Sequence, residues 1–67
     1  MDIETRRARA IGAVRAYMQS HPDYRDGEIC EDAVTDLVAD ILHLCKAEDI
    51  DGERVLRAAA MHYEAEQ

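Results

Sequence analysis

The fold is decided by residues 30–45, which read CEDAVTDLVADILHLC. Apolar residues recur in this stretch at the three- and four-residue spacing that is typical of a helix. On a helical wheel they cover about half of the circumference, which is wider than the stripe that one packing partner requires. We therefore expect a central helix over residues 27–47, capped by Asp26, that contacts two other elements. Its apolar residues are Cys30, Ala33, Val34, Leu37, Val38, Ile41, Leu42, Leu44 and Cys45.

Two further helices are predicted on either side of this central helix. Residues 3–20 follow Asp2, which is a suitable N-cap, and they end before Pro22 because the residue before a proline avoids the helical conformation. Residues 52–65 follow Asp51, a second suitable N-cap. No segment alternates apolar and polar residues for long enough to form a strand. The sequence predicts one all-α domain, residues 1–67, that is a three-helix bundle or a helical hairpin with an N-terminal helical arm.

The composition limits what this domain can do. Its 67 residues carry a net charge of −7, and 48% of them are hydrophobic, although eleven of these are alanine. Phosphate binding requires many lysines and arginines, so we expect no direct contact with nucleic acid. A bilayer span needs about 20 apolar residues, and the longest apolar run is four residues, 58–61. We expect a cytoplasmic protein without a membrane partner.

A chain this short usually needs extra stabilisation from a disulfide, a metal or a partner subunit. Cys30 and Cys45 fall in one predicted helix and would lie about 22 Å apart along its axis, which is too far for an intrachain disulfide. Two interpretations of the cysteines remain open: both thiols are buried, or they form an interchain disulfide in an antiparallel dimer. We therefore expect a homo-oligomer. Its predicted interface residues are Arg7, Val38, Leu42 and Tyr63.

Arg7 interrupts the apolar stripe of the first helix. A guanidinium in such a stripe either extends to the rim of the helix or pairs with a carboxylate of another helix or another subunit. Both interpretations remain open from the sequence alone.

Charge is distributed unevenly along the chain. Residues 1–27 hold five arginines and four acids, a net charge of +1, whereas residues 28–67 hold eleven acids and three bases, a net charge of −8. A negative surface attracts a positive one, so we expect a partner protein with a basic, nucleic-acid-binding surface. The predicted partner-binding residues are Glu28, Glu31, Asp32, Asp36, Asp40, Glu48 and Asp49. The leading hypothesis is a non-enzymatic inhibitor or regulator of a host complex, of phage or mobile-element type.

Three polar side chains of the central helix could hold a metal. Asp36, Asp40 and His43 share one helix face, and two carboxylates with an imidazole are ligands for a divalent cation. This face is opposite the apolar stripe, so we interpret it as solvated surface and assign no catalytic residue, metal ligand or cofactor. Two alternatives remain: a metal-dependent nucleotide hydrolase that is completed across a subunit interface, and a purely structural oligomer that exchanges its first helix.

Residues 36–59, DLVADILHLCKAEDIDGERVLRAA, resemble one helix–turn–helix step of the MazG-type all-α nucleoside triphosphate pyrophosphohydrolases. In that family a magnesium site combines Glu-x-x-Glu on one helix with Glu-x-x-Asp on another. Asp36 matches the Asp of the second motif, but Ala33 stands where its Glu should be, so no catalytic residue carries over. The whole chain also resembles short helical proteins of bacterial and phage genomes, and this second resemblance implies no function.

Overall fold

The computed structural model describes residues 2–66, and they form three helices and no strand. The helices are α1 (Ile3–Ser20), α2 (Glu31–Ala47) and α3 (Gly52–Ala65). The all-α prediction is confirmed, and the bounds of α1 and α3 are those predicted from the sequence. Asp2 caps α1 by accepting a hydrogen bond from the Glu4 N–H at 3.4 Å. Asp51 caps α3 by accepting from the Arg54 N–H at 3.1 Å.

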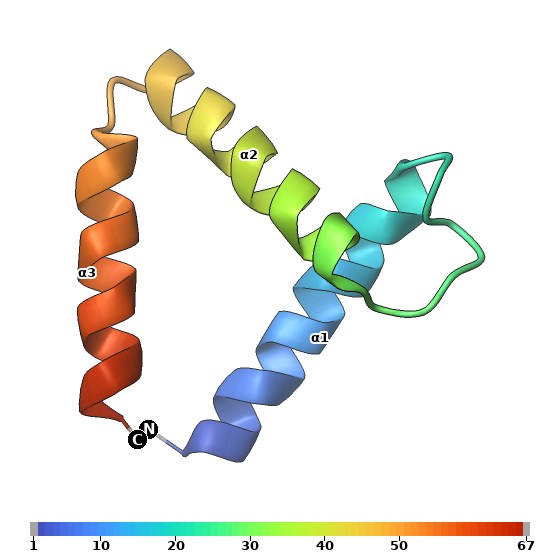
Figure 1. The fold of residues 1–67 in the computed structure, drawn as a ribbon, viewed down its shortest axis with the longest axis horizontal. Helices are drawn as coiled ribbons and strands as arrows, with labels where there is room; N and C mark the ends of the chain where they lie inside the picture. Colours follow the sequence, from blue (N-terminus) through green and yellow to red (C-terminus); the bar gives the residue numbers. More distant parts are fainter. Residues whose placement is uncertain (1, 67) are drawn as a thin grey trace.

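The three helices form the sides of an open triangle (Figure 1). The first half of α2 crosses the C-terminal half of α1, and α3 runs back until its last turn approaches the first turn of α1. The Cα atoms span 33 × 31 × 16 Å, and their radius of gyration is 13.1 Å, whereas a compact domain of this length has a radius of about 11 Å. The helices therefore form a single layer, although a hydrophobic core normally lies between two layers.

The buried core of this layer is very small. Among the described residues, only Met18, Ala33 and Cys45 are buried, with exposed fractions of 3%, 0% and 6%. Large apolar side chains are exposed on all three helices and in both connections. They are Ile3, Ile11, Ile29, Val34, Ile41, Leu44, Ile50, Val55, Leu56, Met61 and Tyr63.

The predicted start of the central helix at residue 27 is wrong, because α2 begins at Glu31. Residues 28–30 are not helical. Residues 21–27 before them are wound into turns, in which the Tyr24 N–H donates to the His21 carbonyl and the Gly27 N–H donates to the Tyr24 carbonyl, both at 3.1 Å. The N-cap is Cys30 rather than Asp26, and its side chain makes no capping hydrogen bond.

The same shift changes the environment of the two cysteines. Cys45 is buried, as expected, whereas Cys30 is exposed in the N-cap position. The prediction of two buried thiols is therefore wrong for Cys30, because the helix whose apolar face would have buried this side chain begins after it.

The connection between α2 and α3 is a tight turn that ends α2. The Ile50 N–H donates to the Cys45 carbonyl at 2.8 Å and the Asp49 N–H donates to the Lys46 carbonyl at 3.3 Å, which is the Schellman pattern of hydrogen bonds. Asp49 adopts a positive φ of 59°. This left-handed conformation costs a residue with a Cβ atom roughly 1–2 kcal/mol, and aspartate is one of the few that tolerate it.

We expect Asp49→Gly to raise the free energy of unfolding by about 0.5–1 kcal/mol, because glycine adopts a positive φ without steric cost. Urea denaturation at a fixed protein concentration measures this change. Asp49→Ala removes the same carboxylate but keeps a Cβ atom, so we expect it to destabilise the chain. If both variants had the same stability, the left-handed turn would not be the cause.

Candidate functional site

A cluster of polar and aromatic side chains joins α2 to the end of α1. The Tyr24 hydroxyl donates to Asp36 Oδ2 at 2.6 Å, and the Tyr17 hydroxyl donates to Asp40 Oδ2 at 2.7 Å. The His21 ring packs beside both tyrosines, with its centroid 4.5 Å from that of Tyr24 and 5.9 Å from that of Tyr17. These five residues, which we call the Tyr–Asp cluster, connect two carboxylates one turn apart on α2 to the segment that precedes it.

The hydrogen bonds of the cluster keep its phenols protonated. The hydrogen bond to Asp40, with desolvation and the negative charge of that carboxylate, raises the pKa of Tyr17 to about 12. The hydrogen bond to Asp36 raises the pKa of Tyr24 further. Both shifts have the same origin, because a phenolate could not donate to the carboxylate and would be repelled by it. The two tyrosines are therefore hydrogen-bond donors at neutral pH, which suits a structural contact.

These shifts predict a loss of stability at alkaline pH. An unfolded tyrosine has a pKa of about 10, and the folded value is higher, so the contribution of the cluster is complete below pH 10. It is lost as the pH rises towards about 12, where Tyr17 ionises in the folded chain. We expect the thermal unfolding midpoint to fall across this window.

The double variant Tyr17→Phe/Tyr24→Phe is the control for this pH dependence. It lacks both phenols, so its midpoint should be lower at neutral pH and should change less across the alkaline window. Parallel curves for the variant and the wild type would show that the cluster does not titrate as described.

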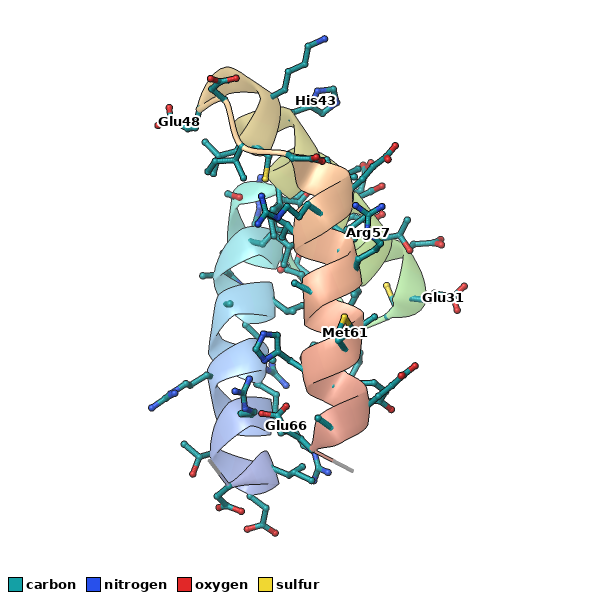
Figure 2. The ribbon with its side chains drawn as sticks, turned by 90° about the vertical axis from the view of Figure 1, so that its left-hand side faces the viewer. Glu31, His43, Glu48, Arg57, Met61 and Glu66 are labelled. Atoms are coloured by element: carbon teal, nitrogen blue, oxygen red, sulfur yellow. The ribbon has the colours of Figure 1, made fainter. Side chains whose placement is uncertain are left out.

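The structure separates the predicted partner-binding acids into three groups. Glu28, Glu31 and Asp32 are exposed at the N-terminal end of α2, whereas Glu48 and Asp49 are exposed in the turn beyond its C-terminal end. A helix of 17 residues separates these two groups by about 25 Å. Figure 2 shows Glu48 near the top of the molecule on the left and Glu31 at about mid-height on the right. The predicted set is therefore not one continuous surface.

The third group, Asp36 and Asp40, lies on the face that was predicted to be solvated, and Asp40 is exposed there. Asp36 is half-buried, and each carboxylate accepts a tyrosine hydroxyl. The reason is the crossing of α1 over this part of α2, which brings the two phenols within reach. His43 is exposed on the last turns of α2 (Figure 2). Within residues 2–66, no three His, Cys, Asp or Glu side chains converge as a metal site requires.

The predicted interface residues also lie in two different places. Arg7 and Tyr63 line a groove of about 510 Å³ between α1 and α3, together with Ile3 and Ala10. Val38 and Leu42 are half-buried on α2. The Leu42 side chain packs against Gly52, where an added Cβ atom would lie 2.7 Å from Leu42 Cδ2.

The groove between α1 and α3 also shows whether Arg7 pairs with a carboxylate of another helix. The ion pair between α1 and α3 is made by its neighbour, with 2.7 Å between Arg6 Nε and Glu66 Oε2. Arg7 itself is exposed and lines the groove. Of the two interpretations of Arg7, the structure agrees with the one in which the guanidinium extends to the rim of the helix, and the ion pair between helices is made by Arg6 instead.

Comparisons of the chain with protein-family models, curated proteins and solved structures gave no match. Across residues 2–66, no helix combines the length and the apolar character needed to cross a membrane. Function is therefore inferred from the chain's own surface. Its two prominent features are the exposed carboxylates around α2 and the exposed apolar residues of the helices' apolar faces. We call the second set the apolar stripe: Ile3, Ile11, Val34, Ile41, Leu44, Val55, Leu56 and Tyr63.

Proposed function

We propose that this chain is a non-enzymatic, cytoplasmic protein–protein interaction module. One observation carries the proposal: a single layer of helices leaves large apolar side chains in contact with solvent. Ile41 is 41% exposed, Leu44 is 59% exposed and Tyr63 is 65% exposed. Large exposed apolar patches mark sites of contact with other proteins.

The exposed carboxylates favour a basic partner. The N-terminal end of α2 presents Glu28, Glu31 and Asp32 to solvent, within a segment whose net charge is −8. Such a surface speeds the encounter with a positive one and selects against negative partners. Proteins that bind nucleic acid have such a positive surface. The proposal therefore includes an inhibitor of phage or mobile-element type that binds to this surface in place of the nucleic acid.

The nucleotide hydrolase has less support than this interaction module. Its metal site would need the carboxylates of Asp36 and Asp40 together with His43. Both carboxylates are hydrogen-bonded to tyrosines, and His43 is exposed further along the helix. The purely structural oligomer shares the apolar stripe with the leading proposal and differs from it in needing no foreign partner.

Affinity capture with the full chain as bait, from an extract of the cells that express it, tests the proposed function. We expect the bait Glu31→Lys/Asp32→Lys to retain at least about tenfold less partner than the wild type, because the two lysines replace attraction to a basic partner by repulsion. The matched control, Glu53→Lys/Glu64→Lys, reverses two charges on α3 and should retain the partner. Equal retention by both baits, or no specific partner for the wild type, would refute the proposal.

A further inference from the structure

We infer that the uncovered apolar stripe is the interface of a homodimer, in which a second copy of this chain supplies the missing second layer. The inference rests on the proposed function, because it assigns one occupant, a second copy, to the apolar part of the interaction surface, whereas the basic partner is assigned to the exposed acids at the N-terminal end of α2. Two properties of the molecule support a second copy: its accessible area and its flat shape.

The accessible area is the quantitative argument. The chain exposes 5639 Å², whereas a compact monomer of 7.6 kDa exposes about 4,300 Å². The excess of about 1,300 Å² per chain corresponds to an interface of about 2,600 Å² in total, which lies in the range of obligate homodimers. A dimer that buried this area would restore the accessible surface expected for a compact protein.

The shape of the molecule suits this arrangement. The triangle is 16 Å thick, so two copies placed face to face would form the usual two layers around one core. The apolar stripe of α1 faces the other helices, because Met18 is buried and Ile3, Arg7 and Ala10 line the groove with Tyr63 of α3. The groove between α1 and α3 therefore belongs to the surface that a partner can cover.

Sedimentation equilibrium of the full chain and two variants tests the inference. The wild type should sediment at twice the chain mass of 7.6 kDa. Ile41→Asp places a charge in the stripe, at a side chain that is 41% exposed in the single chain, and should reduce the mass to that of one chain. Met61→Asp is the matched control, because Met61 is 70% exposed on the outer side of α3 (Figure 2) and should leave the dimer intact.

Circular dichroism of the same samples separates dissociation from unfolding. If Ile41→Asp loses its helices, Leu44→Asp is the second variant, since Leu44 is 59% exposed and contributes less to the single chain. A folded wild-type chain of monomer mass at every concentration, or a dimer that persists in both stripe variants, would overturn the inference. Either result would leave the proposed function to the capture experiment, which uses acids outside the stripe.

Discussion

Met18→Ala is expected to lower the free energy of unfolding by about 2–5 kcal/mol, the usual cost of removing a large buried side chain. Met18 is 3% exposed and is the only large side chain among the three buried ones. It lies in the half of α1 that α2 crosses (Figure 1). With so little other core, the surrounding residues cannot compensate for its loss, and small domains have only about 5–15 kcal/mol to lose.

The control for this prediction is Met61→Ala. Met61 is 70% exposed, so the same substitution should change the stability by less than about 0.5 kcal/mol. Urea denaturation of both variants at one protein concentration measures the difference. Similar losses for the two methionines would contradict the burial of Met18 at the crossing of the helices.

Ala33→Leu is expected to destabilise the chain by about 1–3 kcal/mol through overpacking. Ala33 is 0% exposed on the first turn of α2, so a larger side chain would push α2 away from its neighbours. It would also disturb the nearby hydrogen bond between Tyr24 and Asp36. Because the two helices touch over a short segment, this displacement would separate α2 from α1.

Ala39→Leu is the matched control, since Ala39 is exposed on the same helix. Alanine and leucine have similar helix propensities, so this variant should differ little from the wild type in the same urea denaturation. If Ala33→Leu were as stable as Ala39→Leu, the close contact between α1 and α2 would be absent.

The parts of the fold that could be predicted are those with local signals. Asp2 and Asp51 cap α1 and α3 through hydrogen bonds to residues two and three positions away, and Pro22 ends α1 through its effect on the preceding residues. The predicted start of α2 was wrong because the actual start depends on a contact between residues that are far apart in the sequence. The bond from Tyr24 to Asp36 joins residues 12 apart, and α2 begins at Glu31 rather than at residue 27, where Asp26 and the apolar pattern favoured a start.

The candidate site, too, could be predicted only where its signal is local in the sequence. The uneven charge could be read from the sequence, but the direction of Asp36 and Asp40 could not, since it depends on which side of α2 meets α1. A helix turns by about 100° per residue, so the choice between Arg6 and Arg7 for the ion pair to Glu66 required the relative placement of α1 and α3. The missed signal was a pair of tyrosines, Tyr17 and Tyr24, spaced to reach carboxylates one turn apart.

We expect a second copy of the chain to cover the apolar stripe of this single layer of helices and to add to its stability. Thermal unfolding of the wild-type chain over about a hundredfold range of concentration tests it most directly, because association stabilises the folded state by mass action. We predict a midpoint that rises steadily with concentration. A midpoint that stays constant over the whole range would show that the layer folds alone and would contradict the claim.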